Sequence, residues 1–167
     1  MENNLTFDFA VDKATHTIRV KKELATSLPT AWDVFTKPEL LDQWWAPQPY
    51  QSKTKSMEFK VGGNWLYAMH GPEGDEHWAI ADFKSITPKT NFKYTDGFCD
   101  KEGKINHKMP CVAWDLHFIP KGKSTLVDIV IQCNSKSDLE KLIEMGFKEG
   151  FSIALDGLDE ILSTSKK

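Results

Sequence analysis

Residues 137–163 read S-D-L-E-K-L-I-E-M-G-F-K-E-G-F-S-I-A-L-D-G-L-D-E-I-L-S, the longest amphipathic stretch of the chain. Its apolar residues recur at the i, i+3, i+4, i+7 spacing of one helix face. Ser137 and Glu140 match a capping box at its start. We expect one long helix from Ser137 to about Ser163, against which the other apolar faces of the chain pack. The apolar positions are Leu139, Leu142, Ile143, Phe147, Phe151, Ala154, Leu158, Ile161 and Leu162.

Three glycines, Gly146, Gly150 and Gly157, lie along one edge of this apolar stripe. A glycine inside a helix costs about 1 kcal/mol relative to alanine, so some compensating feature is expected. One interpretation is that the backbone of a strand approaches the helix closely at these positions. The other is that the missing side chains leave room for a ligand.

The composition is that of an ordinary globular protein. The chain has 167 residues, 27% of them charged, with a net charge of -3. This balance gives no indication of binding to nucleic acid or to a membrane. The N-terminus does not resemble a signal peptide, and no apolar run is long enough to span a bilayer. Cys99, Cys111 and Cys133 are odd in number and widely spaced, which favours reduced thiols and a cytoplasmic location.

The chain before the long helix shows mainly the period-two pattern of strands. Residues 5–11 and 17–24 read as two strands, and two short proline-initiated helices follow between residues 27 and 46. Residues 52–133 read as five or six further strands separated by turns, with a long polar loop from about Asp96 to Lys108. Short turns between consecutive strands favour antiparallel pairing. We therefore expect a single α+β domain over residues 1–167, with a curved antiparallel sheet wrapped around the terminal helix.

Side chains alternate between the two faces of a strand. One consistent phase places Asp82, Lys93, Asp115, His117 and Asp128 on the outer face of the sheet. The same phase directs a mainly aromatic and branched set toward the helix. This inward set consists of Trp65, Tyr67, Met69, Ala81, Phe83, Phe92, Tyr94, Trp114, Leu116, Phe118, Val127, Ile129 and Ile131.

No motif of a catalytic or metal centre is present in the sequence. The chain has no G-x-S-x-G, C-x-x-C, H-E-x-x-H, G-x-G-x-x-G or phosphate-binding loop. His70 and His77 flank a hairpin tip that also carries Asp75 and Glu76, but solvated histidines at such a tip are the favoured interpretation. We assign no catalytic residue, no metal site and no cofactor. Whether the protein is an enzyme stays open, with a non-catalytic role favoured.

Aromatic residues are the stronger signal in this sequence. Several should converge between the sheet and the long helix, where they form either a packed aromatic core or the walls of a ligand cavity, since small-molecule sites are mostly apolar. The candidate ligand-binding residues are Trp44, Trp45, Trp65, Tyr67, Met69, Phe83, Tyr94, Trp114, Phe147, Gly150 and Phe151.

The order of several short motifs resembles one known family. These motifs are Pro38-Glu39-Leu40 with Trp44-Trp45, Val61-Gly62-Gly63, Met69 with Gly71-Pro72-Glu73-Gly74, Ile86-Thr87-Pro88, G-K-S-T-L at residues 122–126, Glu149-Gly150, and L-D-G-L-D-E-I-L at residues 155–162. Together they resemble the family named after the C-terminal domain of the activator of heat-shock protein 90 ATPase. That family belongs to the START-like superfamily, also called SRPBCC or Bet v-type. The resemblance covers about residues 21–163.

The resemblance implies a helix-grip fold with a cavity between the sheet and the C-terminal helix. It also implies that a small hydrophobic molecule is the expected partner, because members of the superfamily bind lipids, hormones and polyketides. A chaperone is an alternative partner. The co-chaperones of this family, however, also carry a separate N-terminal domain, and no counterpart of it is expected in residues 1–167, which makes chaperone activation the less favoured expectation. The sequence does not distinguish a monomer from a homodimer.

Three functions follow as hypotheses, and each predicts a different structural feature. A ligand-binding protein predicts a pocket lined by the aromatic residues. A chaperone-interacting module predicts an exposed apolar patch larger than a few hundred Å². An enzyme of cyclase or hydrolase type predicts a carboxylate or histidine inside the pocket with a displaced pKa.

Overall fold

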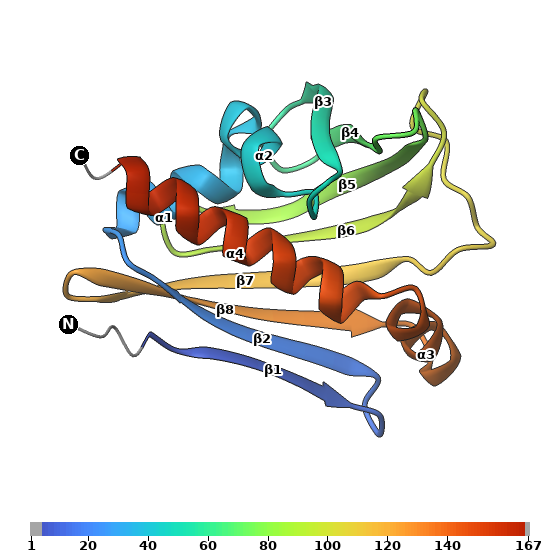
Figure 1. The fold of residues 1–167 in the computed structure, drawn as a ribbon. Helices are drawn as coiled ribbons and strands as arrows, with labels where there is room; N and C mark the ends of the chain where they lie inside the picture. The colour runs from blue at the N-terminus through green and yellow to red at the C-terminus, as the bar shows by residue number, and fades with distance from the viewer. Residues whose placement is uncertain (1–4, 166–167) are drawn as a thin grey trace.

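One curved antiparallel sheet and four helices make up the fold (Figure 1). The computed structural model describes residues 5–165, so the two ends of the expected domain, residues 1–4 and 166–167, lie outside the described residues. The elements in chain order are β1 (Phe7–Asp12), β2 (Thr17–Leu24), α1 (Leu28–Thr36), α2 (Pro38–Trp44), β3 (Gln51–Met57), β4 (Asn64–His70), β5 (Glu76–Thr87), β6 (Asn91–Cys99), β7 (Val112–Lys121), β8 (Ser124–Cys133), α3 (Lys136–Glu144) and α4 (Phe147–Ser165).

The eight strands are ordered β1-β2-β8-β7-β6-β5-β4-β3, with antiparallel pairing throughout. Strands β3 to β8 form a meander, and the β1–β2 hairpin joins it through pairing of β2 with β8. Register shifts at Thr54/Ser56 and at Phe83/Ser85 mark irregularities in β3 and β5. Such bulges bend and twist a strand, which helps the sheet to curve around α4. The expected helix-grip architecture is confirmed (Figure 1).

The predicted strand phase is also confirmed. The inward set is buried, apart from the half-buried Met69, and the outward Lys93 and His117 are exposed. The inward side chains pack against the apolar face of α4, where Leu155 and Leu158 are at most 1% exposed. The polar loop, however, begins later than expected. β6 continues through Asp96 to Cys99, and this extension matters for the site described below.

The expected single helix is two helices, which is a correction to the sequence interpretation. α3 ends at Glu144, and Gly146 has a φ of 88° before α4 begins at Phe147. Glycine adopts this left-handed conformation without steric cost, and it commonly ends helices there. The amide of Gly146 donates to the carbonyl of Ile143 at 3.0 Å, which closes the last turn of α3. Gly146 is therefore a helix terminator, and the apolar periodicity runs on through the break.

The helix also starts two residues earlier than the capping box predicted. Ser135 is the N-cap of α3, and its side chain accepts a hydrogen bond from the amide of Asp138 at 3.1 Å. Ser137 lies inside the first turn, so the expected Ser137 to Glu140 box is wrong. The sequence holds two serines that are each followed by an acidic residue three positions later, and the structure uses the first.

Replacing Ser135 with alanine is expected to lower the free energy of unfolding by about 1 kcal/mol, because the Asp138 amide loses its acceptor. Ser137→Ala is the matched control and should leave stability within about 0.5 kcal/mol of the wild type. Urea denaturation of both variants, read as the midpoint at constant m, measures the difference. Equal midpoints for Ser135→Ala and the wild type would contradict this cap.

None of the helices in the described part of the chain is long and apolar enough to cross a membrane.

Candidate functional site

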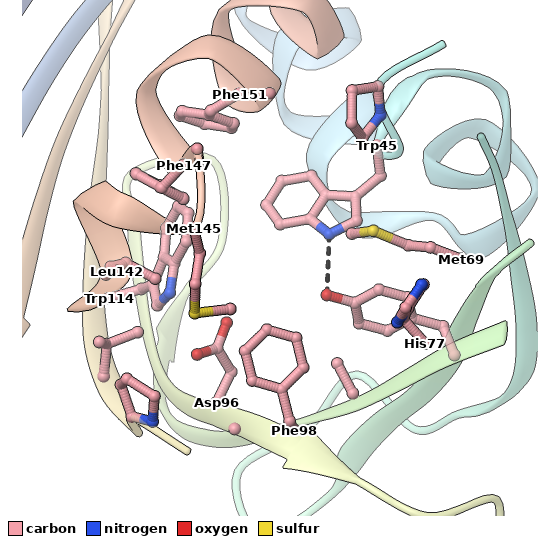
Figure 2. Close-up of a pocket in the computed structure, with 18 residues that line it drawn as sticks. Trp45, Met69, His77, Asp96, Phe98, Trp114, Leu142, Met145, Phe147 and Phe151 are labelled. Atoms are coloured by element: carbon pink, nitrogen blue, oxygen red, sulfur yellow. Dashed lines mark hydrogen bonds between the residues drawn. The ribbon is translucent and has the colours of Figure 1, made fainter. Parts of the chain in front are cut away.

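A cavity of about 240 Å³ opens between one end of the sheet and the α3–α4 junction (Figure 2). Its walls come from the turn that follows α2, from strands β4 to β7 and the loop before β7, and from both C-terminal helices and their junction. Most of the lining is aromatic or aliphatic. The lining residues are Trp45, Pro47, Tyr67, Met69, His77, Ala79, Asp96, Gly97, Phe98, Pro110, Val112, Trp114, Leu142, Met145, Gly146, Phe147, Gly150 and Phe151.

The structure brings seven of the eleven sequence-predicted residues to this cavity, namely Trp45, Tyr67, Met69, Trp114, Phe147, Gly150 and Phe151. The other four belong to the packed core around it. Trp44 donates its indole N–H to the carbonyl of Val34 at 2.8 Å, and Trp65, Phe83 and Tyr94 are at most 4% exposed. The rings that line the cavity therefore lie in front of a second group of aromatic rings that belongs to the buried core.

The surroundings of Gly150 distinguish the two interpretations of the helix glycines, namely close approach of a strand backbone and room for a ligand. A Cβ atom added at Gly150 would meet only the ring of Pro47, at 3.5 Å from Cγ, which is an ordinary van der Waals distance. Within 4 Å of that position there is no strand backbone, so close approach of a strand does not explain this glycine. At Gly157 an added Cβ would meet nothing within 4 Å. Of these two glycines, only Gly150 lines the cavity.

Trp45 forms the central wall between the cavity and the core. Its indole N–H donates to the hydroxyl of Tyr67 at 2.9 Å, the bond drawn in Figure 2. Its ring also lies within 6 Å of four other aromatic rings, mostly edge to face. Burial raises the pKa of Tyr67, so its hydroxyl remains neutral and can still donate its own proton. The rings that contact Trp45 are those of Trp44, Trp65, Trp114 and Phe151.

A polar network outside the cavity fixes the position of Trp45. The carboxylate of Asp42 on α2 accepts hydrogen bonds from the amide and the hydroxyl of Thr54, at 3.1 and 2.7 Å. The hydroxyl of Thr54 in turn accepts from the indole N–H of Trp65 at 2.9 Å. Because these bonds tie α2 to β3 and β4, the side chain that follows α2 is held against Tyr67.

Asp96 is the one carboxylate among the cavity-lining residues. Figure 2 shows its side chain directed into the space between Phe98 and Met145. Burial raises its pKa from 3.8 to about 7, since desolvation penalises the charged form, while the indole N–H of Trp114 acts in the opposite direction. Asp96 is half-buried and lines the cavity.

Trp114 has an unusual indole nitrogen. Its Nε1 is the one buried side-chain nitrogen or oxygen among the described residues that forms no hydrogen bond. Buried indole N–H groups normally find an acceptor. The indole N–H of Trp114 favours the ionised form of Asp96, so the two side chains are neighbours in the cavity wall.

Sequence analysis missed Asp96 because it ended the strand at Thr95. Phe92 and Tyr94 point inward, and the same alternation carried two steps further places Asp96 and Phe98 on the inner face. The same alternation on β5, followed from the inward Ala81 toward the N-terminus of the strand, identifies Ala79 and His77 as cavity residues. The period-two pattern was therefore a sufficient signal for these residues. Met145 and Pro110 lie in connections where no such period applies.

The histidines at the hairpin tip are paired with carboxylates. His77 lies 3.0 Å from Asp75, which also accepts a hydrogen bond from the hydroxyl of Tyr50 at 2.7 Å. His70 lies 3.6 Å from Glu76. His77 is exposed, so it lies at the mouth of the cavity, as does Met145, which is 44% exposed.

The three cysteines are free thiols. Burial raises the pKa of Cys99 and of Cys133 to about 11 and also raises the pKa of Cys111. All three are therefore neutral and weakly nucleophilic at pH 7.

Comparison with known proteins gives the family. The family model described as "Activator of Hsp90 ATPase homolog 1-like protein" matches residues 25–163. The chain belongs to this family. The match extends from the end of β2 through α4, so it contains every element that lines the cavity. The family resemblance inferred from the sequence is confirmed.

Solved structures similar to this family member cover almost the whole chain. The solution structure of a protein from Arthrobacter aurescens is 25% identical, has a TM-score of 0.89, and the match covers 94% of this chain and 91% of that one. The crystal structure of protein Ms6760 from Mycobacterium smegmatis is also 25% identical, with a TM-score of 0.86 and coverage of 95% and 96%. A comparison with proteins of curated function gave no match.

Proposed function

We propose that this family member is a cytoplasmic protein that binds a compact hydrophobic molecule in the cavity between the sheet and the α3–α4 junction. The observation that carries the proposal is the cavity of about 240 Å³, walled by aromatic rings and carrying few polar groups. Such a lining is typical of small-molecule sites, and the volume lies just below their usual range of roughly 300–1,000 Å³. Free thiols and the sequence composition support the cytoplasmic assignment.

The cavity offers a ligand two kinds of contact, an apolar surface of aromatic rings and two polar side chains. Trp45, Trp114, Phe147 and Phe151 offer ring faces and edges, and burial of a hydrophobic ligand against them is worth roughly 25 cal/mol per Å² before the costs of association. The Asp96 carboxylate and the Tyr67 hydroxyl would fix the orientation of the ligand.

The direct test is native mass spectrometry of the protein purified from its own host, where a retained ligand appears as added mass. A second test uses naphthylmethanol as a neutral probe, with quenching of tryptophan fluorescence as the readout, because Trp45 and Trp114 line the cavity. The absence of both added mass and quenching would reject the proposal.

Gly150→Leu is expected to weaken probe binding at least about tenfold, because the new side chain would fill space beside Pro47 that the ligand needs. Gly157→Leu is the matched control. Both variants gain up to about 1 kcal/mol of helix propensity, whereas only the first places its side chain at the cavity. Titration of the probe and urea denaturation of both variants separate the effects. Equal probe affinity in the two variants would contradict the location of the site.

Asp96 favours a second candidate function, catalysis in the same cavity. A carboxyl with a pKa of about 7 is suited to act as a general acid or base at neutral pH. The described residues around it offer no activated nucleophile, since the nearby thiols are neutral. Conversion of a bound ligand by the wild type and not by Asp96→Asn, followed by mass spectrometry, would establish this role.

A further inference from the structure

We infer that the cavity selects a hydrophobic amine, bound as an ammonium ion at the Asp96 carboxylate with its apolar body against the surrounding aromatic rings. This inference rests on the proposed function and names the chemical class of its ligand. Three features of the cavity carry it: its charge, its ring walls and the unpaired donor of Trp114.

The charge of the cavity has one sign. Apart from the indole N–H of Trp114, which acts on its charge, the Asp96 carboxylate has no hydrogen-bond or ion-pair partner among residues 5–165. The cavity-lining residues include no lysine and no arginine. His77, the one lining side chain that can become cationic, lies at the mouth and is paired with Asp75. A fatty acid or another organic anion would thus meet a carboxylate and no inner cation, whereas an ammonium group would supply the missing partner.

The ring walls favour the same ligand class. Six aromatic side chains line the space around Asp96, and ring faces attract cations through their quadrupole. A carboxylate surrounded by aromatic rings therefore stabilises an organic ammonium in two ways, through a charge-assisted hydrogen bond and through cation–π contact. The rings are those of Trp45, Tyr67, Phe98, Trp114, Phe147 and Phe151.

The indole N–H of Trp114 supports the ionised form of Asp96 once a cation is bound. It is buried and unpaired, and it already favours the carboxylate over the neutral acid. The other titratable groups that interact with this charge are neutral at pH 7. They are Tyr67 of β4, Tyr94 of β6, Cys111 before β7 and Cys133 of β8. Asp138 of α3 acts on the same two thiols and adds further negative charge. None of these groups opposes an incoming ammonium.

Two matched series of probes test the inference by isothermal titration calorimetry at pH 8. The first is naphthylmethylamine, naphthylmethanol and naphthoate, and the second is benzylamine, benzyl alcohol and benzoate, in case the larger scaffold does not fit. In at least one series the amine should bind at least about tenfold tighter than the alcohol, and the carboxylate should bind weakest. Asp96→Asn should remove the preference for the amine over the alcohol, measured as the ratio of the two dissociation constants in the same variant. At pH 5 the wild type should lose much of the same preference, because Asp96 is then protonated.

The controls keep the two proposals separable. Asp82→Asn removes a carboxylate from the outer face of β5 and should keep the amine preference. Asp96→Ser is a second variant in case Asp96→Asn is poorly folded by circular dichroism. If the alcohols bind but the amines bind no tighter, the inference is wrong and the proposed function stands. Tightest binding of a carboxylate, or an amine preference that persists in both Asp96 variants, would equally overturn the inference. If no compound binds, the inference fails, and the proposed function fails with it only when native mass spectrometry also shows no retained ligand.

Discussion

Replacing Asp96 with asparagine is expected to stabilise the protein at pH 8 by on the order of 4 kcal/mol and to change little at pH 4. Burial raises the pKa of Asp96 to about 7, against 3.8 for an exposed aspartate. Between these values the native protein holds a proton that the unfolded chain has released. Wild-type stability should therefore fall by about 1.4 kcal/mol per pH unit as the pH rises from about 4 to about 7, and then level off. Asparagine is uncharged at every pH, so the free energy of unfolding of the variant should not fall over this pH range.

Urea denaturation of both proteins at pH 4, 5.5, 7 and 8 measures the effect as the difference in free energy of unfolding. Asp82→Asn is the control for removal of a carboxylate from the outer face of the sheet, and it should not reproduce the gain. A saturating amine should narrow the difference between Asp96→Asn and the wild type at pH 8, since it compensates the charge in the wild type only. Equal stabilities of Asp96→Asn and the wild type at pH 8 would contradict burial of an ionisable carboxyl.

The second large effect is expected at Trp45. Trp45→Ala should lower the free energy of unfolding by about 3–5 kcal/mol, because it removes a side chain that is 7% exposed and leaves a void between sheet and α4. It also leaves the hydroxyl of Tyr67 without the donor that now lies 2.9 Å away. Probe binding should be lost together with this wall of the cavity.

Two further variants divide the Trp45 effect into its parts. Trp45→Phe keeps much of the ring volume and removes the N–H group, so its cost should be clearly smaller than that of Trp45→Ala. Trp78→Ala removes a half-buried tryptophan of β5 that lies outside the cavity lining, and it controls for loss of an indole elsewhere. Midpoints of thermal or urea unfolding rank the three variants. A cost for Trp45→Ala no larger than that for Trp78→Ala would contradict the central role of Trp45.

Alternation in the strands carried most of the information that the sequence held about the fold. Inward positions such as Tyr94 and Trp114 follow from a period of two, and their burial follows from the packing of a single helix on one face. The same rule, applied as far as Phe98, would also have located Asp96. The error lay in ending a strand at a charged residue, although a carboxylate on an inner face is a typical feature of functional sites.

The break between α3 and α4 could not be read from periodicity. The apolar spacing continues through Met145 and Gly146 as though the helix were unbroken, and the decisive property is the left-handed backbone of Gly146. A glycine inside a periodic stretch is compatible with a helix interior, a terminator or a contact surface, and Gly157, Gly146 and Gly150 occupy these three situations in turn. Only the tertiary structure distinguishes them. The identity of the ligand depends on the side chains inside the cavity, and neither the fold nor the family determines it.

The pairing of β2 with β8 also sets the order in which the chain can fold. Thr17 and Gln132, which are hydrogen-bonded through their side chains, are 115 positions apart in the chain. Ile18, Val20 and Leu24 of β2 are 0% exposed in the finished sheet, yet the strand that pairs with them is the last to be synthesised. Closing so long a loop is slow, and contacts of this separation delay folding. A nascent chain leaving the ribosome must therefore keep the apolar side chains of β2 without their strand partner until β8 has been synthesised, and the sheet closes only then.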